Sequence, residues 1–291
     1  MTGSERPEEV APVLLEALPY IRRFSGRVIV VKYGGSALDT GGSGAESALA
    51  SFAQDIVLLA SVGIRPVVVH GGGPQIGAMM RRLGKEAEFQ DGLRVTDLET
   101  LEIARMVLVG KVNREFVSAI NAHGPLAVGL SGEDARLITA VQRSADLGYV
   151  GDIAEVDPKM LEGLIAQGLV PVIASVGIDT AGQAYNINAD TAAGAIAASL
   201  RADKLVYMTD VQGVQSSGGE TPCLLEQVSV PEVARLVDDG VVYGGMIPKL
   251  ESAANAVKAG VRRAHLLDGT VPHALLVELF TDSGVGTMVV P

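Results

Sequence analysis

Residues 28–35, which read V-I-V-V-K-Y-G-G, decide the fold of this chain. The four apolar, β-branched residues 28–31 suit a buried parallel strand. We expect this strand to end just before Lys32, with a tight turn at Tyr33, Gly34 and Gly35. Two glycines let the backbone approach an anion closely, and a neighbouring lysine adds a compact positive charge. The stretch therefore predicts either a phosphate-binding turn or an ordinary strand-to-helix turn with a surface lysine.

A second glycine turn follows the predicted strand 66–69. It reads H-G-G-G-P-Q-I-G over residues 70–77 and leads into a helix, whose free N-terminal N–H groups form a ready anion site. A dinucleotide-binding turn requires G-x-G-x-x-G, whereas Gly71, Gly73 and Gly77 give G-x-G-x-x-x-G. The spacing therefore disfavours an NAD-dependent dehydrogenase.

The composition excludes several classes of protein. The chain has 291 residues, of which 48% are hydrophobic and 35 are glycine, which is typical of an α/β protein with one large domain or two lobes. Its net charge of −11 disfavours nucleic acid and anionic membranes as partners. The single cysteine, Cys223, fits a reducing compartment. Residues 1–9 lack the features of a signal peptide, and no apolar run reaches about 18 residues, so we expect a soluble cytoplasmic protein.

Strand and helix patterns alternate along the rest of the chain. The first helix, 7–24, precedes the first core strand and could pack on its own domain or on another subunit. Further helices are predicted over 46–62, 98–120, 160–166, 192–200, 230–237 and 250–259, and further strands over 127–130, 147–156, 169–174, 204–209, 263–267 and 274–280.

Polar residues interrupt this pattern at two places. Asn186, Asn188 and Asp190 alternate in Y-N-I-N-A-D-T, residues 185–191, so an extended segment would place all three side chains on one side. Alternatively, Asp190 caps the following helix and the asparagines belong to a turn. Arg94, in a turn-like segment, is a candidate carboxylate clamp because its guanidinium group can bind in a bidentate manner. Together with the glycine turns and lysines, these residues favour phosphoryl transfer, which depends on alignment and charge neutralisation.

With these motifs in order, the chain resembles the amino-acid kinase superfamily and, within it, the acetylglutamate kinase family. The resemblance covers nearly the whole chain. It rests on V-V-K-Y-G-G at 30–35, V-V-V-H-G-G-G-P-Q-I at 67–76, G-L-R-V-T at 92–96, G-L-S-G-E-D-A at 129–135, Y-N-I-N-A-D-T-A-A-G at 185–194, M-T-D-V-Q-G-V at 208–214, G-G-M-I-P-K at 244–249 and H-A-L-L-V-E-L-F-T-D-S-G-V-G-T at 273–287.

The resemblance implies a three-layer α/β/α sandwich around a largely parallel open sheet. Its parts would be an N-terminal arm (1–27), an acyl-amino-acid lobe (28–200) and a nucleotide lobe (201–291). It implies ATP-dependent phosphorylation of the side-chain carboxylate of N-acetyl-L-glutamate in arginine biosynthesis, with magnesium held mostly by ATP phosphates and water. Alternatives are the same reaction on a related acid, such as an aminoadipate derivative, or a catalytically silent amino-acid sensor.

The resemblance also implies roles for individual residues of this chain. Lys32 and Lys249 would stabilise the transferring phosphoryl group, and Asp190 would orient both lysines. The N–H groups of Gly34, Gly35 and Gly71 would cradle the phosphate. The acyl amino acid would be held by Gly72, Gly73, Arg94 and Asn186, with Asn188 supporting that site, and the nucleotide would lie near Thr209, Asp210 and Gly213.

An amphipathic arm such as 7–24 marks, in the resemblance, the members that L-arginine inhibits. There the arms interlock dimers into a hexamer, a trimer of dimers, and arginine binds between the arm and the last lobe and favours open lobes. The matched residues are Tyr20, His265, Glu278 and Gly286. The chain departs from the family pattern at Ser36, Glu133 and Thr270, and Thr270 bears on regulation more than on catalysis.

Overall fold

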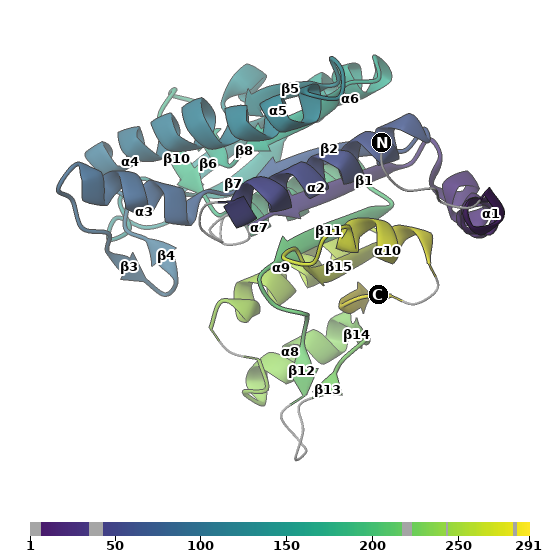
Figure 1. The fold of residues 1–291 in the computed structure, drawn as a ribbon. Helices are drawn as coiled ribbons and strands as arrows, with labels where there is room; N and C mark the ends of the chain where they lie inside the picture. The colour runs from purple at the N-terminus through teal and green to yellow at the C-terminus, as the bar shows by residue number, and fades with distance from the viewer. Residues whose placement is uncertain (1–6, 35–42, 217–222, 243, 282–283) are drawn as a thin grey trace.

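One eight-stranded sheet runs through both predicted lobes of the molecule, seen here in a computed structural model (Figure 1). The structure describes residues 7–34, 43–216, 223–242, 244–281 and 284–291. The strand order is β14-β16-β15-β11-β1-β2-β8-β5, and every pair is parallel except β15 with β16. The strands are β1 (Val28–Tyr33), β2 (Arg65–His70), β5 (Ala127–Ser131), β8 (Val170–Ala174), β11 (Lys204–Thr209), β14 (Gln227–Ser229), β15 (Arg263–Asp268) and β16 (Thr287–Val290).

Helices cover both faces of this sheet, which gives the predicted three layers. The side chains of β1 alternate between two hydrophobic cores: Ile29, Val31 and Tyr33 belong to one, and Val30 belongs to the other. The first core is covered by α2 (Ser43–Ser61), α4 (Leu98–Arg105), α5 (Asn113–Asn121) and α10 (Ala274–Phe280). The second is covered by α6 (Lys159–Ala166), α7 (Ala189–Ser199), α8 (Val230–Asp238) and α9 (Met246–Lys258).

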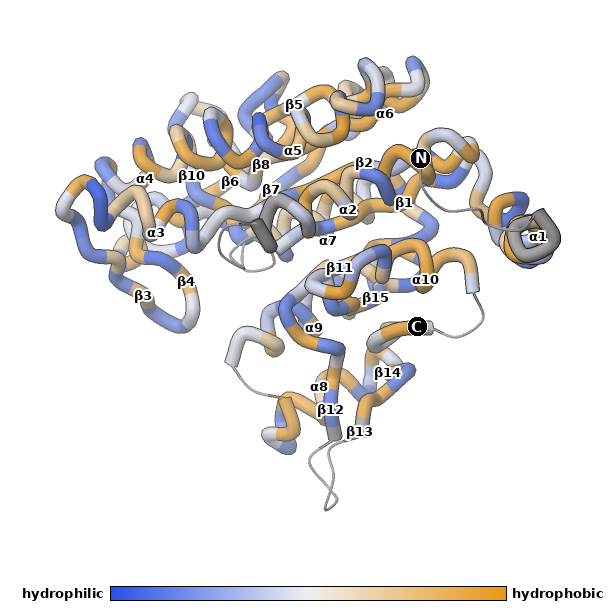
Figure 2. Tube along the Cα trace, in the orientation of Figure 1, coloured by the Kyte–Doolittle hydropathy of each residue, from blue (hydrophilic) through white to orange (hydrophobic). Residues whose placement is uncertain are grey.

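Smaller elements extend from the sheet. Strands β6 (Ile138–Gln142), β7 (Val150–Val156), β9 (Val176–Ile178) and β10 (Ala184–Ile187) form a closed four-stranded barrel in the first lobe. Two short hairpins are β3 (Phe89–Gln90) with β4 (Leu93–Arg94) and β12 (Gln215–Ser216) with β13 (Cys223–Leu224). Figure 2 shows hydrophobic residues along the strands of the sheet, whereas the tip of the β3–β4 hairpin is hydrophilic.

Helix α1 (Pro7–Phe24) lies at the side of the molecule, beside α10 of the same chain (Figure 1). Its bounds match the helix predicted over residues 7–24. Apolar side chains along it remain exposed, namely Val13, Leu14, Leu15 and Leu18. No helix within the described residues has both the length and the apolar character needed to cross a bilayer.

The structure corrects four local predictions. Segment 274–280, predicted as a strand, is helix α10; its buried Leu275 and Leu279 lie one turn apart, a spacing that a short apolar run conceals. Lys32 and Tyr33 lie within β1 rather than after it. Strands β6 and β9 were not predicted. The single helix predicted over 98–120 is α4, a π-helical turn (Met106–Val112) and α5.

Candidate active site

The central strand β1 delivers Lys32 to the carboxyl edge of the sheet. Strand alternation turns Lys32 toward the face that α7 covers, where its side chain is almost fully buried, with 7% of it exposed. β1 lies between β2 of the first lobe and β11 of the second, so chain connections diverge on either side of it. Ligands of open α/β sheets bind at such a point, beyond the carboxyl ends of the strands.

Asp190 joins Lys32 to a second lysine. Its Oδ1 atom lies 2.7 Å from the Nζ atom of Lys32, and its Oδ2 atom lies 3.2 Å from the Nζ atom of Lys249. Burial alone would raise the pKa of Asp190, but the two ammonium groups outweigh burial and hold that pKa below its usual value. The trio thus carries one net positive charge, which suits a site for a phosphoryl group.

The trio sits at two helix N-termini. Asn188 caps α7, because its Oδ1 atom accepts hydrogen bonds from the N–H groups of Asp190 (2.8 Å) and Thr191 (3.0 Å). The alternative in which Asp190 caps the helix is therefore wrong, and so is a fully extended segment 186–190. Lys249 lies in the first turn of α9, where the helix dipole disfavours a cation. An anionic ligand here would relieve that cost.

Two buried hydroxyl groups, those of Ser252 and Tyr207, support the main chain of Asp190. The Oγ atom of Ser252 donates to the main-chain oxygen of Asp190 at 2.8 Å, and the hydroxyl of Tyr207 contacts Ser252 Oγ at 2.8 Å. Sequence reasoning did not identify these residues. A tyrosine within the apolar strand 204–209 was the available signal, because a buried phenol needs a hydrogen-bond partner.

One cavity of about 280 Å³ brings the predicted acid and phosphate residues together. Gly35 lies outside the described residues. Side chains from both lobes line the cavity, since Arg94 belongs to the first and Lys249 to the second. The predicted residues on its wall are Lys32, Gly34, Gly71, Gly72, Gly73, Arg94, Asn186, Asn188, Asp190 and Lys249.

Two of the four glycine N–H groups at the wall of this cavity already donate to backbone carbonyls. The N–H of Gly34 donates to Met208 O at 3.1 Å and that of Gly71 to Tyr33 O at 3.4 Å, because both groups continue backbone pairing beyond β1. The N–H groups of Gly72 and Gly73 donate to no residue that the structure describes. Among the described residues, Gly72 and Gly73 thus carry N–H groups without a protein acceptor, whereas those of Gly34 and Gly71 are paired with backbone carbonyls.

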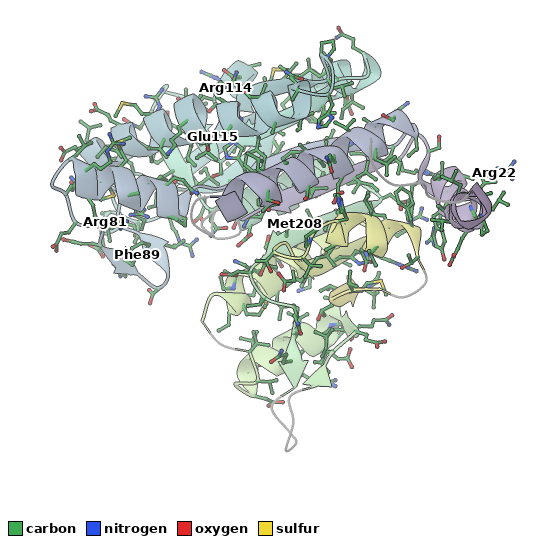
Figure 3. All side chains as sticks on the ribbon, viewed as in Figure 1. Arg22, Arg81, Phe89, Arg114, Glu115 and Met208 are labelled. Atoms are coloured by element: carbon green, nitrogen blue, oxygen red, sulfur yellow. The ribbon has the colours of Figure 1, made fainter. Side chains whose placement is uncertain are left out.

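Arg94 reaches the cavity from the β3–β4 hairpin. Its Nη2 atom donates to Gly73 O at 2.9 Å, and its guanidinium group lies over the ring of Phe89, 4.7 Å from the centroid. Figure 3 shows Phe89 on this hairpin, where the side chain is 60% exposed. Burial lowers the pKa of Arg94 from its usual value, yet an arginine remains charged at neutral pH. The stacked guanidinium is thus placed to bind a carboxylate.

A second cavity shares Lys249 with the first. Thr209, Asp210 and Gly213, the three residues predicted to lie near the nucleotide, all line it. Gly213 adopts φ +137°, and a Cβ atom there would lie 2.6 Å from Thr287 Oγ1, so this turn requires glycine. Apolar side chains, among them Val214 and Val242, make up much of the remaining wall, as expected of a pocket for a planar base.

A third cavity lies between α1 and the second lobe. The predicted residues Tyr20, His265, Glu278 and Gly286, which come from three separate segments of the sequence, all line it. Glu278 Oε1 lies 2.7 Å from His265 Nδ1 and 3.5 Å from the Nζ atom of Lys204. Burial would raise the pKa of Glu278, but these two partners hold it below its usual value.

Lys204 also lines this third cavity, although it was not predicted from the sequence. It opens an otherwise apolar strand, which was a usable signal, and its ammonium group lies 5.2 Å from the ring centroid of Phe24. Arg23 and Arg263 line the same cavity. The cavity thus combines several cationic groups with the carboxylates of Glu226 and Glu278.

Comparisons with known proteins agree with this geometry. The sequence profile of the amino acid kinase family matches residues 27–268. Acetylglutamate kinase from Symbiobacterium thermophilum is 53% identical over 96% of this chain and 97% of its own length, and that from Acidothermus cellulolyticus is 52% identical over 97% and 96%.

Solved structures extend the similarity. N-acetylglutamate synthase from Neisseria gonorrhoeae, solved with coenzyme A and N-acetyl-glutamate, superposes with a TM-score of 0.84 at 30% identity. The match covers 97% of this chain but only 63% of the synthase chain. The same synthase was also solved with coenzyme A and L-arginine. Carbamate kinase from Giardia lamblia shares the fold, with a TM-score of 0.66 at 17% identity over 91% of this chain and 98% of its own.

Proposed function

Since the chain belongs to the amino acid kinase family, and within it to the acetylglutamate kinases, we propose that it phosphorylates N-acetyl-L-glutamate in arginine biosynthesis. ATP would donate its γ-phosphoryl group to the side-chain carboxylate, giving N-acetyl-L-glutamyl 5-phosphate and ADP. The observation that carries the proposal is the Lys32–Asp190–Lys249 trio, which lies where the two cavities meet.

The mechanism needs little proton transfer. A side-chain carboxylate is already ionised at neutral pH, so an oxygen atom of the substrate can attack the γ-phosphorus without a general base. Charge spreads over the three equatorial oxygens in the transition state. Lys32 and Lys249 would neutralise that charge, and Asp190 would keep both ammonium groups aimed at it. Arg94 and the Gly72 and Gly73 N–H groups would hold the acyl amino acid in line.

Magnesium would arrive with ATP, where it neutralises charge on the β- and γ-phosphates. Within the described residues, no three acidic, His or Cys side chains are grouped to hold a metal. Asp190 is committed to its lysines, so Asp210 is the carboxylate that the nucleotide cavity offers. This donor set fits an ion held chiefly by phosphate oxygens and water.

The proposal is tested by the initial rate of ADP release over a panel of acids. We expect N-acetyl-L-glutamate to give the highest kcat/KM, above N-acetyl-L-aspartate, unacetylated glutamate and N-acetyl-aminoadipate. A higher kcat/KM for the aminoadipate derivative would show that the enzyme carries out the same phosphoryl transfer on a different acid. No turnover with any acid would favour a silent sensor.

Substitution of Arg94 by lysine is expected to raise KM for the acyl amino acid by about tenfold or more, because a point charge replaces a bidentate fork. The KM for ATP should change much less, since Arg94 lines the acid cavity and not the nucleotide cavity. Initial rates with each substrate varied in turn measure both constants. Equal changes in the two KM values would remove Arg94 from the acid site.

We further propose that L-arginine inhibits this enzyme by binding in the third cavity, in an assembly of six chains. Neutral His265 donates from Nδ1 to Glu278, so its buried Nε2 atom is an acceptor, and it contacts no described hydrogen-bond donor. A guanidinium group, which only donates, would satisfy both His265 and Glu278. Lys204 and Arg23 would face the α-carboxylate. A zwitterion with a cationic tail thus matches the charges of the cavity, and the synthase relative was solved with the same amino acid.

The Glu278→Gln variant is expected to raise the arginine concentration for half-inhibition by at least about tenfold, because a charged acceptor is lost. Glu162→Gln, at an exposed position of α6, is the control, and its arginine sensitivity should match that of the wild type. Solution mass with and without residues 1–24 tests whether α1 supports assembly. A wild-type enzyme that arginine never inhibits, or a Glu278→Gln enzyme of unchanged sensitivity, would contradict the regulatory proposal and leave the kinase proposal intact.

A further inference from the structure

A buried histidine stands directly behind the glycine turn of the acid cavity. His70 ends β2, is 0% exposed, and lines none of the three cavities described above. Its ring stacks on Phe116 of α5, with centroids 5.4 Å apart and planes inclined by 19°. A histidine with no access to substrate needs another explanation for its polar atoms.

Both ring nitrogens of His70 have defined partners. Nε2 lies 3.0 Å from Asn113 Nδ2, and Nδ1 lies 3.1 Å from Gly71 O. Asn113 Nδ2 also lies 2.9 Å from Val172 O, and a carbonyl oxygen can only accept, so this atom is the amide nitrogen and donates. The Gly71 carbonyl can also only accept, so the ring proton lies on Nδ1, where it donates to that oxygen, and Nε2 is left as the acceptor that faces Asn113 Nδ2.

A π-helical turn leads directly into Asn113. This turn, Met106–Val112, ends immediately before Asn113. Such turns are rare and are frequently found at functional sites. The same turn packs closely against the glycine loop. A Cβ atom on Gly72 would lie 2.8 Å from Leu108 Cδ2 and 3.3 Å from Val112 Cγ2. Figure 3 shows the neighbouring Arg114 on α5, and the guanidinium of Arg114 donates to the side-chain oxygen of Asn113.

We propose that His70 is a positioning residue for the acyl-amino-acid site: held by Asn113, it fixes the Gly71 carbonyl and thereby orients the Gly72 N–H. In a trans peptide, the carbonyl of Gly71 and the N–H of Gly72 point in opposite directions. Fixing the carbonyl on the buried side directs the N–H away from it, and this N–H donates to no described residue. Burial lowers the pKa of His70 to about 4, so the ring stays neutral and keeps its single proton on Nδ1. The inference rests on the proposed function, because it assigns the oriented N–H to the acyl amino acid.

Two matched variants separate positioning from packing. In His70→Asn the side-chain amide can occupy the Nδ1 position and still donate to Gly71 O. In His70→Gln the amide occupies the Nε2 position, so contact with Asn113 survives and the donor to Gly71 is lost. We expect His70→Gln to lower kcat/KM for N-acetyl-L-glutamate by about tenfold, the loss of one hydrogen bond, with KM for ATP little changed. His70→Asn should retain clearly more activity, and thermal melting reports whether each variant folds.

Equal losses in the two variants, with an active wild type, would overturn the positioning role and leave the kinase proposal standing. A second measurement needs no activity at all. ¹⁵N NMR of histidine-labelled wild-type protein, whose four histidines are assigned by comparison with His70→Gln, should show a protonated Nδ1 and an unprotonated Nε2 for His70 throughout pH 6 to 8. A proton on Nε2, or titration of His70 within that range, would contradict the inference even if the wild type failed to phosphorylate N-acetyl-L-glutamate.

Discussion

Substitution of Lys32 or Lys249 by alanine is expected to lower kcat by at least about 10²-fold, because in the proposed mechanism each ammonium group acts mainly on charge that develops in the transition state. The two lysines come from opposite lobes, one on β1 and one in the first turn of α9, yet both contact the same carboxylate. Two ammonium groups around one carboxylate leave a net positive charge, which costs free energy unless an anionic ligand binds beside them. Steady-state kcat with N-acetyl-L-glutamate and ATP measures the effect.

The matched control for Lys249→Ala is Lys258→Ala, at the exposed end of the same helix. Lys258 lies in the last turn of α9 and lines neither active-site cavity, so its removal should leave kcat close to wild type. Thermal melting of each variant shows whether the fold persists. Near-normal turnover in either Lys32→Ala or Lys249→Ala would refute the two-lysine mechanism.

Substitution of Asp190 by asparagine is expected to reduce both activity and stability. The side chain keeps its shape but loses its charge, which leaves the buried ammonium of Lys32 without a counter-ion. Breaking such a pair costs about 3–5 kcal/mol, so the free energy of unfolding should fall by roughly that amount, and kcat by about 10²-fold or more. Denaturant titration and steady-state kinetics measure the two effects.

The pH dependence of the same variant supplies a further test. The folded pKa of Asp190 lies below its unfolded value, so its ion pairs stabilise the protein above the unfolded pKa, and this stability is lost as pH falls through the folded pKa. Asp190→Asn should therefore destabilise strongly at pH 7 and progressively less toward acid. Asp238→Asn, on the exposed end of α8, is the control. An Asp190→Asn protein as stable as wild type at pH 7 would show that the trio is not held by this charge.

Much of the fold could be predicted because the strands carry simple patterns. The run 28–31 in β1 and the buried strand β8 are continuous apolar segments, and β11 is largely apolar after Lys204. Segment 274–280 was mistaken for a strand because a run of seven mostly apolar residues fits both the two-residue repeat of a strand and the 3.6-residue repeat of a helix. Strand β6 was missed because it contributes to a small barrel in which Val141 is exposed and Ile138 is buried, so its apolar residues do not mark one face.

The position of most candidate site residues followed from motifs, whereas their hydrogen-bonding states did not. Lys32, Asp190 and Lys249 share a cavity as expected, but sequence could not show that the Gly34 and Gly71 N–H groups are already used by neighbouring strands. The π-helical turn at 106–112 was also invisible, since a one-residue insertion barely alters a helical apolar pattern. Contacts between elements far apart in sequence, such as Asn113 with His70, decide these details.

The most direct test of the central claim is chemical trapping of the product. Wild-type enzyme is incubated with ATP, magnesium and N-acetyl-L-glutamate in the presence of hydroxylamine, which converts an acyl phosphate into a hydroxamate. We expect N-acetylglutamyl hydroxamate in amounts equal to the ADP released, with none formed when either substrate is omitted or when Lys32 is replaced by alanine. ADP release without hydroxamate would show that the phosphoryl group goes elsewhere than to the carboxylate, and would contradict the account.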